Sequence, residues 1–144
     1  MDRLTQDRLP LVAHLGEEVQ PMSEVVSPRE VAEALTELWS PRVIAELEDS
    51  YVKVAKLQGS LVWHSHDEED ELFFVLKGSL RIEMEDRTVE LGEGEAFVVP
   101  KGVRHNPVAD QECHVMLIER KTTQHTGDEV TEKTRSVADQ LRPV

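Results

Sequence analysis

The segment that decides the fold is VWHSHDEEDELFFVLKG, residues 62–78. It holds two histidines one residue apart, then five consecutive acidic residues, then an apolar run that ends in glycine. We expect a hairpin, with one strand ending at His66, an acidic turn, and a second strand starting at Glu71. Side chains alternate along a strand, so His64 and His66 project from one face, separated by two rises of about 3.3 Å. The turn lets Glu71 face back toward them, which predicts three potential metal ligands.

A fourth candidate ligand is His105. It follows Pro100 and Gly102, turn-forming residues that can bring a side chain back to the same end of the sheet. Three neutral imidazoles and a carboxylate suit iron(II), manganese, nickel, copper or zinc, and the ligand types alone do not choose among these ions. A six-coordinate ion would keep two open positions, which favours chemistry over a structural role. Asp70 is the alternative carboxylate to Glu71. The predicted metal ligands are His64, His66, Glu71 and His105.

The chain around this segment consists of short β-branched and aromatic runs separated by turn-forming clusters. The expected strands are 42–47, 51–57, 61–66, 71–76, 80–85, 87–91, 95–100 and 114–120. Short strands at intervals of about ten residues, with no helices between them, indicate an antiparallel sandwich or barrel. Leu80, Ile82 and Met84 alternate with charged residues, so their strand has one buried face and one wet face. The predicted fold class is therefore all-β.

Two motifs carry a family resemblance. GSLVWHSHDEEDELFFVLKG, residues 59–78, resembles the first motif of the cupin superfamily: a glycine, then HxH, a glutamate after four further residues, and a glycine after six more. GEAFVVPKGVRHNPVA, residues 94–109, resembles the second motif: glycine, five residues, proline, any residue, glycine, two residues, histidine. The matching positions are Gly59, His64, His66, Glu71 and Gly78, then Gly94, Pro100, Gly102 and His105.

The resemblance implies a jelly-roll β-barrel that holds one divalent transition metal through the same four residues. Two positions depart from the family pattern. Only four residues separate Gly59 from His64, where the commonest form has five, and Ala109 stands where the second motif often ends in asparagine. Both lie outside the ligand set, so they bear on loop geometry more than on metal binding.

A helix is expected before the strands. SPREVAEALTELW, residues 27–39, has apolar residues at helical spacing. Ser27 can cap its start, Pro28 fits the first helical position, and Glu30 completes a capping box. The sequence therefore predicts one amphipathic helix ahead of the β-rich region.

A chain of 144 residues suits one domain. Residues 1–26 are predicted to be a loosely ordered arm, because they carry scattered charges and no sustained period. A single cupin β-barrel domain with its leading helix is expected over 27–120. Residues 121–144 form a polar tail, and the pattern leaves open whether it wraps the barrel or a partner.

The composition limits the partners. The formal net charge is −13, from 29 acidic and 16 basic side chains, so nucleic acid and anionic membranes would be repelled. The ligands we expect are small molecules or cations. The single cysteine, Cys113, excludes an intramolecular disulfide. No signal peptide and no apolar run of about 20 residues is present, which predicts a cytoplasmic protein.

Several individual residues receive simpler interpretations. Lys53 is expected to be an ordinary solvated charge, and His125 to belong to the tail without a part in the site. The acidic residues 67–70 are expected to form a solvated turn. The helix with Trp39, together with an outward-facing Trp63, leaves more apolar surface than one small barrel covers. A homodimer would bury that surface.

Two classes of function fit these features. The first is a small metal-dependent enzyme, since similar single-domain cupins include dioxygenases, decarboxylases and isomerases that act on small organic acids or sugars. The fold does not fix the chemistry, and no catalytic residue or organic cofactor is assigned. A sugar-phosphate enzyme would need a basic cluster, and only Lys101 and Arg104 stand near His105. The alternative is a non-catalytic small-molecule-binding or sensor cupin.

Overall fold

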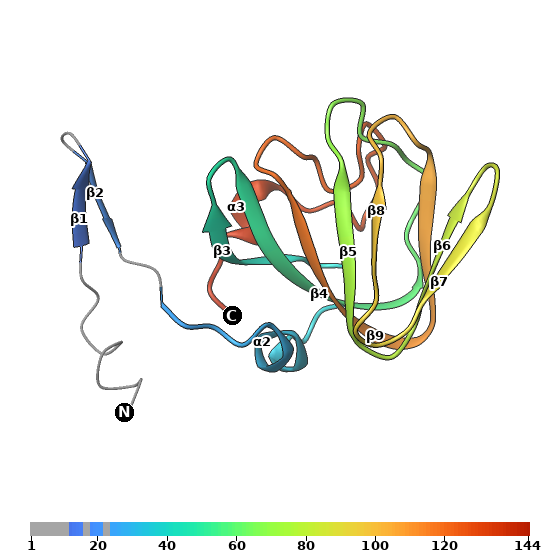
Figure 1. Cartoon of the computed structure of the whole chain (residues 1–144), viewed down its shortest axis with the longest axis horizontal. Helices are drawn as coiled ribbons and strands as arrows, with labels where there is room; N and C mark the ends of the chain where they lie inside the picture. Colours follow the sequence, from blue (N-terminus) through green and yellow to red (C-terminus); the bar gives the residue numbers. More distant parts are fainter. Residues whose placement is uncertain (1–11, 16–17, 22–23) are drawn as a thin grey trace.

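Figure 1 shows the computed structural model of the chain, which describes the backbone of residues 12–15 and 18–21 and all of residues 24–144. β1 (Val12–Leu15) and β2 (Glu18–Pro21) pair as a two-stranded antiparallel sheet. The sequence pattern of the predicted arm did not indicate these strands. The rest of the arm before residue 24 lies outside the described residues.

Seven further strands form one antiparallel sheet, which confirms the predicted all-β fold. They are β3 (Arg42–Leu47), β4 (Ser50–Ser60), β5 (Glu71–Lys77), β6 (Leu80–Met84), β7 (Thr88–Leu91), β8 (Ala96–Val99) and β9 (His105–Arg120). Neighbouring strands follow the order β3-β4-β9-β5-β8, and β6 pairs with β7 and β9. The sheet curls around a common interior (Figure 1), although the hydrogen-bonded ladder of the described strands stays open.

β9 organises this sheet because it pairs with three other strands. β4 lies along one side of it, while β5 and β6 share the other side. Glu71 at the start of β5 lies opposite Glu119, and Met84 at the end of β6 lies opposite His105. One end of β9 therefore pairs with the start of β5, and its other end pairs with the end of β6.

The turn between β5 and β6 depends on a glycine. Gly78 has a φ of +84°, and a Cβ added to it would lie 2.9 Å from the carbonyl oxygen of Glu112 in β9. A side chain there would meet both backbone strain and a backbone atom that cannot move cheaply. The close approach of this turn to β9 therefore requires Gly78.

The predicted strand at 61–66 is not formed. The segment is a loop, joined to β9 by an isolated bridge in which His64 and His105 exchange backbone hydrogen bonds of 3.0 and 2.9 Å. The amide of Leu61 donates to the carbonyl of Pro107, but proline has no N–H to return, so a regular ladder cannot continue. His105, predicted to follow a turn, is the first residue of β9.

The leading helix is shorter than predicted. α2 spans Pro28–Ala34, and Ser27 caps it by accepting a hydrogen bond from the amide of Glu30. The chain leaves the helix at Leu35, whose backbone is extended with a φ of −65° and a ψ of 141°. Trp39 follows with a φ of +56° and packs into the main core. Its indole Nε1 donates to the carbonyl of Gln58 at 2.8 Å. Trp39 has an exposed fraction of 5%, so it is not part of the exposed apolar surface predicted from the sequence.

The tail lies against the chain's own sheet. Lys133 donates to the carbonyl of Ser60, and Arg42 donates to the carbonyl of Pro143 at 3.2 Å. The tail contains one short helix, α3 (Val137–Gln140), which lies between these two contacts in the sequence. Its residue Gln140 is buried, with an exposed fraction of 1%.

Candidate metal centre

The structure brings the four predicted ligands together inside the curled sheet. The candidate donor atoms of His64, His66, Glu71 and His105 all lie within 4.8 Å of one another, and all four side chains are buried. The first two come from the loop before β5, the third opens β5, and the last opens β9. The cluster could therefore hold one metal ion.

Two of the imidazoles are oriented by the backbone. Nδ1 of His64 lies 2.8 Å from the carbonyl oxygen of Val62, and Nδ1 of His105 lies 2.9 Å from that of Val103. A ring nitrogen that faces a carbonyl oxygen carries the proton and donates it. Nε2 of both rings then presents a lone pair to the cluster, which is the arrangement commonly found in metal-binding histidines.

The remaining contacts test whether a cation fits. Oε1 of Glu71 lies 3.2 Å from Nε2 of His105 and 3.5 Å from Nε2 of His66. Nε2 of His66 is buried and has no hydrogen-bond partner among the described residues. Lone pairs on nitrogen and on a carboxylate oxygen repel unless a proton or a cation lies between them. The donor set therefore fits a metal ion.

The protonation states suit the same chemistry. Burial, and then the neighbouring His105, lower the pKa of His64 to about 4, so that this ring is neutral at pH values near 7. Burial acts to raise the pKa of Glu71, but interactions with His105 and His66 lower it well below its ordinary value. A neutral imidazole beside an ionised carboxylate is the form in which these side chains bind metals.

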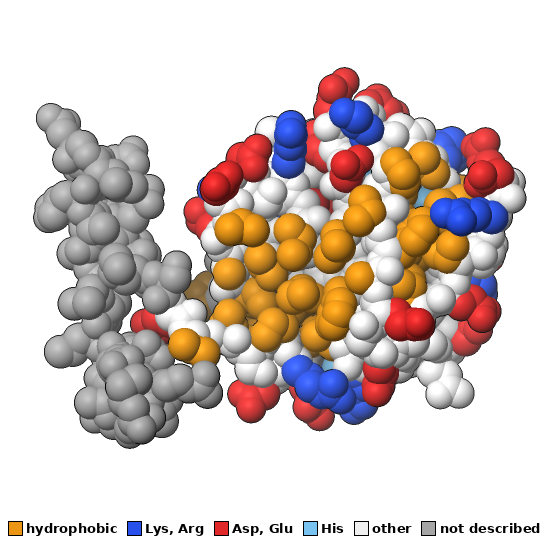
Figure 2. Space-filling view, viewed as in Figure 1, with side chains coloured by type: hydrophobic (Ala, Val, Ile, Leu, Met, Phe, Trp, Pro, Cys, Tyr) orange, Lys and Arg blue, Asp and Glu red, His pale blue; other side chains and the backbone are white. Residues whose placement is uncertain are grey.

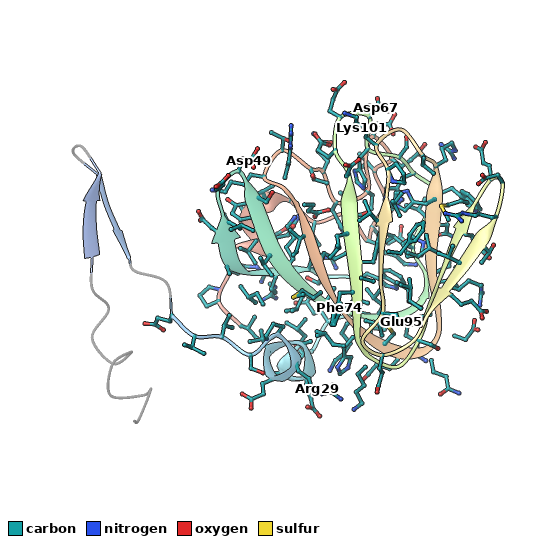
Figure 3. All side chains as sticks on the ribbon, in the orientation of Figure 1. Arg29, Asp49, Asp67, Phe74, Glu95 and Lys101 are labelled. Atoms are coloured by element: carbon teal, nitrogen blue, oxygen red, sulfur yellow. The ribbon has the colours of Figure 1, made fainter. Side chains whose placement is uncertain are left out.

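The acidic turn behaves as predicted, and Asp70 is not part of the cluster. Asp67, Glu68 and Asp70 are exposed, and Oδ1 of Asp70 accepts a hydrogen bond from the amide of Lys101 at 2.9 Å. Figure 3 places Asp67 and Lys101 together at one end of the sheet. Glu71, rather than its neighbour, supplies the carboxylate of the cluster.

The interpretation of Lys53 as a solvated charge is wrong. Lys53 is buried, with an exposed fraction of 1%, and its Nζ donates to Oε1 of Glu119 at 2.7 Å. Glu119 is also buried and lies opposite Glu71 in the sheet. The alternation of side chains along β4 could have predicted this burial, because Lys53 lies on the same face as the core residues Ala55 and Leu57.

The Lys53–Glu119 pair connects directly to the cluster. Burial, and then the charge of Glu71, raise the pKa of Glu119 well above its ordinary value, while Lys53 acts to lower it. Oε2 of Glu119 is buried and has no hydrogen-bond partner among the described residues. Glu119 is therefore a second buried carboxyl group, paired with Lys53 and opposite Glu71 in the sheet.

The interpretation of His125 as unrelated to the site is also wrong. A cavity of about 30 Å³ lies beside the cluster, and His64, Glu71, Glu119 and His125 line it together with apolar side chains. His125 is brought there by the tail, whose turn packs on the loop between the two motif histidines. A Cβ on Gly127 would lie 2.2 Å from the carbonyl oxygen of Ser65. The local sequence does not predict the contact between Gly127 and Ser65, because these residues lie far apart in the chain.

A curled antiparallel sheet that encloses a cluster of three histidines and one carboxylate defines the class of cupin proteins. Residues 50–119 match the family described as the cupin domain. The chain belongs to the cupin superfamily, as the resemblance of its two motifs implied.

Individual relatives agree with this assignment. The chain is 42% identical to a cupin-2 domain containing protein from Shewanella frigidimarina NCIMB 400, with a TM-score of 0.65 over 67% of this chain and 95% of that one. It is 29% identical to protein NMB1881 from Neisseria meningitidis, with a TM-score of 0.63 over 68% and 100% of the two chains. It is also 34% identical over 85 residues to the uncharacterized protein YdbB of Bacillus subtilis, covering 58% of this chain and 75% of that protein.

The described part of the chain contains no helix that is both long and apolar enough to span a membrane. The cytoplasmic location stays a prediction from the sequence.

Proposed function

We propose that the chain binds one divalent transition metal through His64, His66, Glu71 and His105, and that it acts as a metal-dependent enzyme. Its reaction would be of the dioxygenase, decarboxylase or isomerase type, on a small organic acid or a sugar-like substrate. The observation that carries the proposal is Nε2 of His66, which lies beside Glu71, is buried, and has no hydrogen-bond partner in the described part of the chain. Leaving such an atom without a partner costs about 1–3 kcal/mol, which a bound ion would recover.

Each ligand has a separate part in holding the ion. The imidazoles of His64 and His105 are fixed by carbonyl oxygens, so they would bind with little reorganisation. Glu71 contributes the single negative charge of the cluster. A bound transition metal would supply Lewis-acid or redox chemistry, according to which ion is present. The burial of all four side chains would keep bulk water away from the ion.

A non-catalytic cupin is the second candidate, and the small size of the cavity favours it. A space of about 30 Å³ admits roughly two water molecules, so a larger substrate needs the tail to move. A binding or sensor protein can work with a closed site of this kind. Turnover of a small acid that disappears on ligand substitution would favour the enzyme, whereas tight binding without turnover would favour the sensor.

The first experiment is elemental analysis of the purified, tag-free protein before and after reconstitution with divalent metals. We expect about one equivalent of iron, manganese, nickel, copper or zinc per chain, because the four ligands lie close enough together to hold a single ion. Protein that takes up no metal even after reconstitution would contradict the proposal.

We also propose that the protein is a homodimer. The outer face of the sheet carries an apolar cross-strand row formed by Ala45, Val52, Ile118, Leu72 and Val98. Met116 and Phe74 pair in the next row. Figure 2 shows a broad field of apolar side chains on this face, and Figure 3 places Phe74 on it. Apolar sheet faces commonly pack on a second sheet, and a two-fold dimer would bury this one.

Light scattering tests the dimer. We expect twice the 16.4 kDa mass of one chain for the wild type, and a mass nearer to one chain for Ile118→Asp, which places a charge in the middle of the apolar row. Val130→Asp is the matched control, because Val130 is 86% exposed in the tail. A wild-type mass equal to one chain would argue against the dimer.

A further inference from the structure

His125 is the side chain of the tail that reaches the metal cavity. Apart from the cluster, the cavity walls are mainly apolar and come from the sheet and its loops, among them Trp39, Leu61 and Phe73. His64, Glu71 and Glu119 line the same cavity as His125. A polar ring over an apolar cavity, next to a metal cluster, is placed to contact whatever the ion binds.

A hydrogen bond from the backbone determines which tautomer the His125 ring adopts. The amide N–H of Arg135 donates to Nδ1 of His125 at 3.0 Å, so Nδ1 carries no proton. A neutral imidazole then holds its proton on Nε2. Burial lowers the pKa of His125 to about 4, which agrees with a neutral ring at neutral pH. The ring therefore offers one N–H donor on the side opposite Arg135.

The tail holds this ring in place from both sides. Gly127 has a φ of +60° and fits closely against the carbonyl of Ser65, which lies between the two motif histidines. On the other side of the turn, the hydroxyl groups of Thr126 and Thr134 bond to each other at 2.7 Å. Thr126 has an exposed fraction of 0%. The donor is thus part of a packed segment rather than a loose end.

We propose that Nε2–H of His125 recognises an anionic atom of a small ligand bound to the metal, and that the ligand class is a small organic acid. This inference rests on the proposed metal site and narrows the choice of substrate. Outside the cluster, the cavity walls offer only Glu119 and His125 as polar partners, so most hydroxyl groups of a sugar would lie against apolar side chains, which is costly. An acid needs one polar contact besides the ion, and it can turn its apolar part toward Leu61 and Phe73.

The test uses azide, a small anion, titrated into the full-length protein loaded with cobalt(II) and followed by the visible absorption of cobalt. The variants are His125→Phe, which removes the donor, and His125→Gln, which restores an N–H at the end of a side chain of similar length. Gln124→Ala is the control, since Gln124 is an exposed neighbour in the same turn. Cobalt content and the thermal unfolding midpoint are measured for each variant.

We expect His125→Phe to bind cobalt normally and azide about tenfold more weakly, the effect of one lost hydrogen bond to a charged group. His125→Gln should recover part of the affinity, and Gln124→Ala should match the wild type. Acetate should displace azide from the wild type, whereas ethylene glycol, a neutral diol of similar size, should not.

Unchanged azide affinity in His125→Phe, with cobalt bound, would overturn the role of His125 alone. Displacement of azide by ethylene glycol rather than acetate would overturn the assignment to organic acids. Wild-type protein that binds no cobalt would overturn the proposed metal site, and this inference with it.

Discussion

Replacing His105 by alanine is expected to weaken the binding of a divalent transition metal by more than about 100-fold, because loss of even an outer hydrogen-bonding partner of a ligand costs about 10–100-fold. The side chain has an exposed fraction of 0%, and its Nε2 lies 3.2 Å from the carboxylate of Glu71. Water cannot easily replace a ligand removed from so enclosed a position. Isothermal titration with zinc, in competition with a chelator, measures the change.

His114→Ala is the matched control for this prediction. Both histidines are buried residues of β9, but Nε2 of His114 bonds to Glu112 at 3.0 Å instead of joining the cluster. Both variants remove an imidazole from the same strand, so any general loss of stability should appear in each. Equal zinc affinity in His105→Ala and His114→Ala would show that the cluster does not bind the metal.

The four residues of the cluster could be predicted from the sequence because their spacing lies within two short motifs. His64 and His66 reach the interior even though their segment is a loop instead of the expected strand. The reason is that paired backbone hydrogen bonds between His64 and His105 hold the loop against β9. The prediction that these four side chains meet therefore did not depend on the predicted strand, which is not formed.

The rest of the site depends on information that motifs do not carry. Lys53 and Glu119 are 66 positions apart and meet only because β4 and β9 are neighbours. The alternation of each strand would have placed both side chains inward, but charged residues are seldom fully buried unless they are paired. His125 reaches the cavity through the packing of Gly127 on Ser65, which only the folded chain reveals.

Substituting Lys53 by methionine is expected to lower the free energy of unfolding of the metal-free protein by about 3–5 kcal/mol, because it leaves Glu119 buried without its partner. The ion pair is short, at 2.7 Å, and its two side chains have exposed fractions of 1% and 3%. The double variant Lys53→Met/Glu119→Leu should recover most of that loss, since buried pairs are often replaced by apolar residues at little cost. Urea denaturation of the single and double variants measures both effects.

The loss in Lys53→Met should also depend on pH. The pKa of Glu119 is raised by burial and by the charge of Glu71, and removal of Lys53 takes away a group that lowers it. Because the pKa of Glu119 is raised in the folded state, the folded protein loses stability as the pH rises through that pKa. This loss is greater without Lys53, so the destabilisation caused by Lys53→Met should be larger at about pH 8 than at about pH 5. Lys101→Met, on an exposed side chain, should change the stability by less than about 0.5 kcal/mol at either pH. A Lys53→Met variant as stable as this control at both pH values would mean that the buried pair does not stabilise the fold, and that Glu119 is held in place beside Glu71 by other contacts.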